Sequence, residues 1–109
     1  METSKFQNSK IFKLSESIEY GNGAIVSKVI IKKESSNLTL FAFDKGQGLS
    51  EHTAPFDAVV QIVEGSGQII INKVPFNLNA GEFIIMPANV PHAVMANEQF
   101  KMLLIMVKG

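Results

Sequence analysis

The chain contains two histidines, His52 and His92, and these are the residues best suited to carry chemistry. An imidazole near neutral pH donates or accepts a hydrogen bond, moves a proton or binds a metal ion. If the chain after His52 continues as a regular strand, Ala54 and Ala58 point to the same side as this ring. His92 opens a later strand after a proline turn, so the two imidazoles could converge at one mouth of a barrel.

Short apolar segments separated by turn residues predict an all-β fold. Strands are expected over residues 24–33, 38–43, 57–64, 68–72, 74–78, 82–87, 92–96 and 100–108. Gly65-Ser66-Gly67 is expected to form a hairpin turn, and Asn72-Lys73 a tight turn, because asparagine tolerates the left-handed region. Turn signals at intervals of about 8–12 residues are typical of an antiparallel sandwich or barrel.

The N-terminal part of the sequence, before residue 24, does not predict a strand. Residues 1–10 are expected to form a mobile polar tail. Residues 13–20 predict one short helical turn, with Ser15 as its N-cap and Ile18 as its only buried contact. With 109 residues, the chain is expected to fold as a single domain over residues 1–109.

Composition excludes several classes of function. The chain has ten basic and ten acidic residues, and all the basic ones are lysine. It therefore lacks the arginine forks and the basic stripe that nucleic-acid binding needs, so no nucleic-acid partner is expected. The longest aliphatic run, residues 102–107, is far shorter than the roughly 20 residues of a membrane helix, so no membrane partner is expected either. The polar N-terminus does not resemble a signal peptide, and a cytoplasmic location is expected.

Two segments, residues 68–72 and 102–107, carry apolar side chains at both alternating sets of positions. A strand with one face in water would show one polar set. Both faces of these strands are therefore expected to be covered. The cover is either a loop or terminus of the same chain, or a second copy packed sheet on sheet in a homodimer.

The spacing of glycines and histidines between residues 46 and 96 resembles that of the cupin superfamily, over about residues 38 to 108. The first cupin motif is matched by Gly46, His52 and Gly65, but its second histidine falls on Ala54 and its glutamate on Ala58. The second motif reads Gly81, Pro87, Asn89, His92 and Ala96, with asparagine and alanine in place of the usual glycine and asparagine. The resemblance implies a small RmlC-like cupin: an antiparallel double-sheet jelly-roll barrel that forms a homodimer.

In metal-dependent cupins this motif holds iron, manganese, nickel or zinc, and by this resemblance only His52 and His92 survive as ligands. Open catalytic metal sites generally need three protein ligands. The nearest carboxylates, Glu51 and Asp57, point to the opposite face by strand parity, so neither replaces the missing ligands without a bulge. No cofactor is therefore expected, and a divalent metal on the two histidines is the alternative.

Three hypotheses remain open for the function. The favoured one is a metal-free cupin that binds a small organic molecule in a pocket formed by His52, Ala54, Ala58 and His92, because the small alanines leave room for it. The second is a metal-dependent oxygenase or isomerase with two histidine ligands, and the third is a packed structural or interaction module. The histidines could also simply cap strand ends by bonding a nearby carbonyl. The methionines, which include Met86, Met95, Met102 and Met106, fit either adaptable core filling or a pocket lining.

Overall fold

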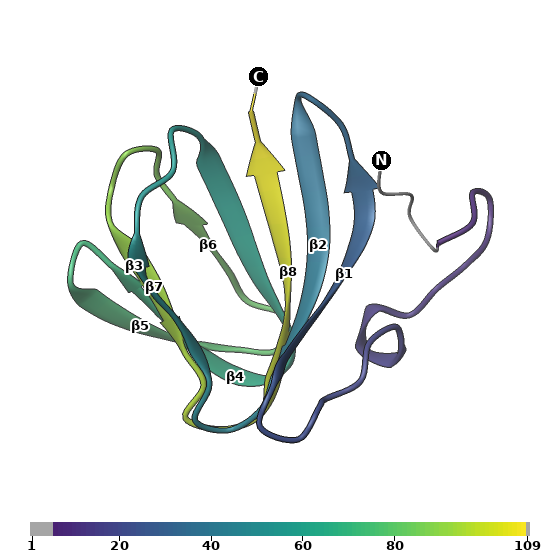
Figure 1. Ribbon diagram of the computed structural model, residues 1–109, viewed down its shortest axis with the longest axis horizontal. Helices are drawn as coiled ribbons and strands as arrows, with labels where there is room; N and C mark the ends of the chain where they lie inside the picture. Colours follow the sequence, from purple (N-terminus) through teal and green to yellow (C-terminus); the bar gives the residue numbers. More distant parts are fainter. Residues whose placement is uncertain (1–5, 109) are drawn as a thin grey trace.

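The computed structural model describes residues 6–108, and strands dominate this part of the chain. The elements are η1 (Leu14–Glu16), β1 (Ile25–Lys32), β2 (Ser36–Phe43), β3 (Gly48–His52), β4 (Asp57–Ile71), β5 (Val74–Asn79), β6 (Phe83–Met86), β7 (His92–Met95) and β8 (Phe100–Val107). All strand pairs are antiparallel. The strands curl into two facing sheets that meet along one side (Figure 1), which confirms the predicted all-β double-sheet barrel.

The long strand β4 belongs to both sheets. Its first half pairs with β6 and β8, and its second half pairs with β5 and β7. The predicted hairpin turn at Gly65-Ser66-Gly67 is therefore wrong, because the strand bends there and continues. Gly65 has a φ of 75°, and a Cβ at Gly65 would lie 2.5 Å from the carbonyl oxygen of Gln99. The glycine thus permits a bend against a neighbouring strand and does not reverse the chain.

The remaining turns follow local sequence signals more closely. Asn72 and Lys73 adopt φ values of 50° and 68° between β4 and β5, which confirms the predicted tight turn. The strand β3 was not predicted, because its sequence GLSEH lacks the β-branched residues typical of strands. It lies at the edge of its sheet and is held by its pairing with β7.

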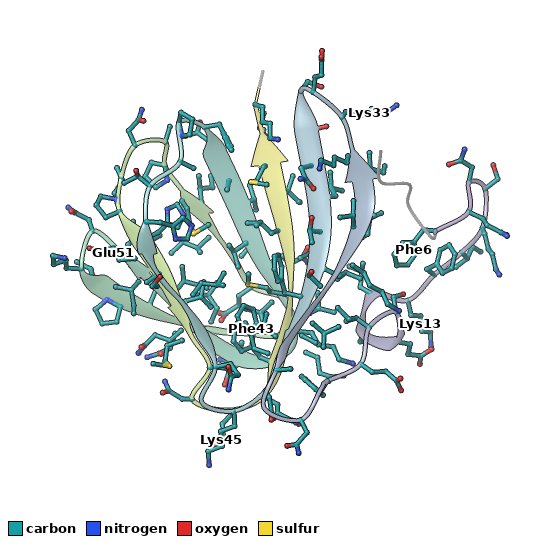
Figure 2. All side chains as sticks on the ribbon, in the orientation of Figure 1. Phe6, Lys13, Lys33, Phe43, Lys45 and Glu51 are labelled. Carbon is teal, nitrogen blue, oxygen red and sulfur yellow. The ribbon has the colours of Figure 1, made fainter. Side chains whose placement is uncertain are left out.

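The main core lies between the two sheets. Phe43 and Phe100 are fully buried there, with stacked rings whose centroids are 4.8 Å apart. Figure 2 shows Phe43 between the facing sheets, close to the side where they meet. The other buried apolar side chains of this core are Ala58, Val60, Ile62, Ile69, Leu78, Met86, Val94, Ala96 and Met102.

A second core lies on the outer face of the sheet formed by β1, β2 and β8, under the N-terminal segment. Ile18 is 1% exposed there and packs with Leu40, Ala42 and Leu103. The burial of Ile18 was predicted, but Ser15 is inside the short 3-10 helix and Lys13 occupies the cap position. A terminus of the same chain therefore covers part of the outer face of β8. The predicted tail lies outside the described residues for 1–5, whereas Phe6 is half-buried against this second core.

A buried lysine ties the N-terminal segment to the sheet. Lys101 is 7% exposed, and its Nζ donates a hydrogen bond of 2.6 Å to the carbonyl oxygen of Ser15. The same Nζ lies 3.5 Å from Oε2 of Glu64 and 5.0 Å from the centre of the Tyr20 ring. The Tyr20 hydroxyl donates to Oε2 of Glu64 at 2.7 Å, and burial together with this carboxylate raises the pKa of Tyr20. The ammonium group therefore has a partner for its charge and for its hydrogen bonding.

Within residues 6–108, no helix is long and apolar enough to cross a membrane. The cytoplasmic location stays a prediction, as does the assignment of residues 1–109 to one domain.

Candidate functional site

The antiparallel pairing of β3 with β7 brings the two histidines together. His52 ends β3 and His92 begins β7, and the two residues are directly opposite each other in the pairing of these strands. The loop before β7 is fixed by Asn89, whose backbone N–H donates to the carbonyl oxygen of Ala54 at 2.7 Å. Asn89 has a φ of 64°, a conformation that asparagine adopts more readily than most residues. This explains how asparagine serves at a position where the motif usually has glycine.

The two imidazoles meet through their Nε2 atoms. These atoms are 3.1 Å apart, and the ring planes are inclined at 74°. Each Nδ1 contacts a backbone carbonyl two residues earlier in the chain: His52 with Ser50 at 2.8 Å and His92 with Val90 at 3.2 Å. Because a carbonyl oxygen only accepts hydrogen bonds, each Nδ1 donates to its carbonyl in the tautomer that carries the ring proton there. With both rings neutral in this tautomer, both Nε2 atoms are acceptors, and a hydrogen-bond donor beside them is needed to pair them.

The two rings differ in their contact with water. His92 is 6% exposed, whereas His52 is exposed. Burial lowers the pKa of His92, the positive charge of a protonated His52 lowers it further, and the Val90 carbonyl partly opposes both effects. The lowered pKa therefore favours the neutral form of His92 near pH 7.

A cavity of about 70 Å³ lies beside these rings, between the two sheets. Its volume is well above that of one water molecule and about half that of an apolar cavity that takes benzene. The lining residues are Leu49, His52, Ala54, Phe56, Ala58, Met86, His92, Val94, Met102, Leu104 and Met106. The imidazoles supply the polar atoms of a wall that is otherwise apolar.

The cavity is lined by all four residues that the sequence analysis assigned to a pocket: His52, Ala54, Ala58 and His92. The regular strand assumed between residues 52 and 58 is interrupted by a loop, because β3 ends at His52 and β4 begins at Asp57. The residues nevertheless reach the same cavity, and their role in binding stays a prediction.

Three methionines, Met86, Met102 and Met106, contribute to the wall, whereas Met95 does not. The sequence left their role open between core filling and pocket lining. Strand pairing would have resolved it, because Ala58 is paired with Met86 on β6 and with Met106 on β8. Paired residues on antiparallel strands share a face of the sheet.

The side chains of this site do not fit the divalent metal that the motif resemblance implies. Among the described residues, no group of three or more His, Cys, Asp or Glu side chains is placed to hold a metal ion. Glu51 forms an ion pair of 3.0 Å with Lys73, and Asp57 accepts a hydrogen bond of 2.8 Å from the backbone N–H of Ala88. These carboxylates are therefore engaged elsewhere and supply no third ligand to the histidines.

Comparisons with known proteins agree with this architecture. A family model described as "Cupin domain" matches residues 39–108. A conserved protein of unknown function from Streptococcus pyogenes is 33% identical, with a TM-score of 0.90 over 95% of this chain and 91% of that chain. A cupin 2 conserved barrel domain protein from Leptotrichia buccalis is 45% identical, with a TM-score of 0.86 over 89% of this chain. The match covers 47% of the Leptotrichia chain, so the present chain spans about half its length.

A cupin superfamily protein from Desulfitobacterium hafniense, 22% identical, has the same fold with a TM-score of 0.90 over 100% of both chains. The comparison with curated proteins found no match.

Proposed function

Because the chain belongs to the cupin family, whose fold hosts many activities, we propose a function from its cavity: it binds a small organic molecule without a divalent metal. The observation that carries this proposal is the pair of Nε2 atoms, 3.1 Å apart, at the wall of an otherwise apolar cavity. A few placed polar groups on an apolar wall are the usual form of a ligand site.

The protonation of the rings defines the ligand that fits. The proposal assigns the ring protons to the Nδ1 atoms, which lie at hydrogen-bond distance from carbonyl oxygens, so that both Nε2 atoms accept. A ligand with one O–H or N–H group donates to them and removes the repulsion between their lone pairs. A carboxylate has no proton to donate and would lose its hydration in an apolar cavity. The proposed ligand is therefore a neutral hydrogen-bond donor with a short apolar body, limited to a few non-hydrogen atoms by the cavity volume.

A matched pair of small molecules tests this proposal. Ethanol and acetate have the same two-carbon body, but only the alcohol carries an O–H at neutral pH. We expect ethanol to shift the imidazole nitrogen signals of His52 and His92 in NMR titrations, and acetate to leave them unchanged. The expected affinity is in the millimolar range, because so small a ligand makes few contacts.

The variant Val94→Phe is the matched control for the cavity, since it fills the wall and keeps both histidines. We expect it to abolish the response to ethanol while the rings keep their carbonyl bonds. Equal responses to the alcohol and the carboxylate, or an unchanged response in Val94→Phe, would contradict the proposal.

We also propose that the chain forms a homodimer through the part of the outer sheet face that the N-terminal segment leaves uncovered. Phe83 and Ile85 on β6 are 63% and 56% exposed, and Val107 on β8 is 53% exposed. Val59 lies between Ile85 and Ile105 in the strand pairing, so an apolar row runs across β6, β4 and β8. Exposed apolar area of this kind is typical of an interaction site.

Light scattering coupled to size-exclusion chromatography tests the homodimer. The unmodified chain is expected to have the mass of a dimer, and Ile85→Lys the mass of a monomer. Val74→Lys is the control, because Val74 is 51% exposed on β5 in the other sheet. A monomeric unmodified chain would refute the proposal.

A further inference from the structure

We propose that the ring of Phe56 is a gate between solvent and the cavity, and that Lys108 holds this gate closed. The inference deepens the proposed function and rests on it, because it concerns how a small molecule reaches the same cavity. It assigns a role to two residues outside the histidine pair. Its test needs no binding at the imidazoles, so its outcome is independent of the ethanol titration.

Phe56 lies between the cavity and the molecular surface. It lines the cavity, and together with Pro55 and Lys108 it also lines a separate depression of the surface. The residue is half-buried, as expected for a ring that contacts both spaces. Rotation of this ring would therefore connect the cavity with solvent.

Phe56 is also the side chain of the cavity wall best placed to move. Most lining residues lie within strands, whereas Ala54 and Phe56 lie in the loop between β3 and β4. Alanine has no side-chain rotamers, whereas phenylalanine can change the direction of its ring by rotation about the Cα–Cβ bond. Among the described lining residues, Phe56 is therefore the only one that combines a place outside the strands with a movable side chain.

The backbone on both sides of Phe56 is held in place, so that opening is a motion of the side chain. The carbonyl oxygen of Ala54 accepts a hydrogen bond of 2.7 Å from the backbone N–H of Asn89. The carboxylate of Asp57 accepts one of 2.8 Å from the backbone N–H of Ala88. These bonds tie both ends of the short segment around Phe56 to the loop before β7, and rotation of the ring breaks neither of them.

Lys108 lies over the ring on the side of the surface depression. Its Nζ is 5.4 Å from the centre of the Phe56 ring, within the range of a cation–π interaction. Asp57 is opposite Val107 in the pairing of β4 with β8. Phe56 precedes the first of these residues and Lys108 follows the second, so the strand register makes them neighbours. The backbone N–H of Lys108 donates to the carbonyl oxygen of Ser35 at 2.7 Å, which fixes the point from which the side chain extends.

The contact between lysine and ring is weak enough to open. A cation–π interaction at an exposed site changes an equilibrium by a factor of about two to five. Lys108 is exposed, so it biases the ring toward the closed position without locking it there. A neutral side chain of similar length at this position should raise the open fraction by the same factor.

Oxidation of the cavity methionines by hydrogen peroxide measures access through the gate. Peroxide is a small neutral molecule that transfers one oxygen to the thioether, which leaves a sulfoxide and water. Met86 and Met102 line the cavity and are 4% and 1% exposed. Met95 is the internal reference, because it is 40% exposed on β7 and does not line the cavity. Peptide mass spectrometry of the full chain gives the rate at each methionine.

The variants should change the rates at the cavity methionines and leave Met95 unchanged. In the unmodified chain we expect Met86 and Met102 to be oxidised at least 100-fold more slowly than Met95. Phe56→Ala should accelerate their oxidation at least tenfold, and Lys108→Gln about two- to fivefold. Lys108→Arg should keep the rate of the unmodified chain, because a guanidinium group also stacks on an aromatic ring.

Two controls separate a gate from general loosening of the barrel. Phe76→Ala makes the same change as Phe56→Ala at a phenylalanine that is 40% exposed on β5 and does not line the cavity. Urea below the unfolding transition is the second control, since oxidation through unfolded molecules accelerates with urea. We expect the rates in Phe56→Ala to be independent of urea in this range.

Equal oxidation of the cavity methionines in Phe56→Ala and in the unmodified chain would overturn the proposal. An equal acceleration in Phe76→Ala, or a rate in Phe56→Ala that rises with low urea, would overturn it as well. Oxidation of Met86 and Met102 as fast as Met95 in the unmodified chain would show that the cavity has no gate. An unchanged rate in Lys108→Gln would refute the role of the lysine. If ethanol does not bind and these rates are as expected, the gate is supported and the proposed function is refuted.

Discussion

Lys101 on the outer face of the sheet and His92 in the inner cavity are both buried, yet their nitrogen atoms have different kinds of partner. The Lys101 ammonium has a carbonyl oxygen, a carboxylate and an aromatic ring, all from the same chain. His92 has a carbonyl oxygen at Nδ1 and the Nε2 atom of His52 at 3.1 Å from its own Nε2. The partners of Lys101 hold its charge inside the fold, whereas the partner of His92 at Nε2 is an exposed side chain at the wall of a cavity.

The largest expected effect comes from a substitution in the second core, on the outer face of the sheet. Ile18→Ala removes a side chain that is 1% exposed under the N-terminal segment. We expect the free energy of unfolding to fall by about 3 kcal/mol, since a buried cavity is created. Chemical denaturation measures this, and Ile11→Ala is the control because Ile11 is 95% exposed. The imidazole NMR signals should stay in place, and large shifts would show that the two regions are not independent.

A smaller effect is expected at the lysine itself. Lys101→Ala leaves the Ser15 carbonyl and Glu64 without their cation, and we expect a loss of about 2 kcal/mol in the free energy of unfolding. Lys101→Met keeps the apolar packing of the side chain and should cost less than the alanine variant. Denaturation of both variants beside the exposed Lys45→Ala measures the difference. If Lys101→Ala is as stable as Lys45→Ala, the contacts of the buried ammonium do not stabilise the fold.

The smallest expected effect is a dependence of stability on pH from His92. The pKa of His92 in the folded chain lies below its ordinary value of 6.5, so the unfolded chain takes up a proton that the folded chain resists. The free energy of unfolding should therefore fall as the pH drops below about 6.5, until the folded pKa is reached. His92→Gln should lose this part of the dependence, measured as the difference between denaturation at pH 7.5 and pH 5.5. An identical pH dependence in the variant would show that His92 does not contribute.

Most of the strands could be predicted from the sequence, because apolar runs and turn residues are local patterns, although β3 was missed. The sequence indicated that His52 and His92 could converge, but their meeting depends on the register between β3 and β7. The course of β4 could not be predicted in this way. The pattern of Gly65 and Gly67 predicts a turn. In the structure these glycines allow a close approach instead, because a Cβ at either position would collide with residues 99–100.

The cavity wall could be predicted only in part. Ala54 and Ala58 were assigned from their positions after His52, along one stretch of chain. Met86 and Met106 come from strands far away in the sequence, and their place beside Ala58 depends on the strand register. Register is set by the whole set of paired strands, so no short segment encodes it.

The course of β4 through both sheets has a consequence for how such a protein diversifies. The sheets are joined by a continuous strand at one end, while the loops at residues 53–56 and 87–91, which follow His52 and precede His92, lie near the other end (Figure 1). These loops are tied to each other by the hydrogen bond from Asn89 to Ala54. Replacement of both loops together should therefore change which molecules enter the cavity. The bend of β4 that joins the two sheets would stay intact, so the barrel is a scaffold for loop grafting.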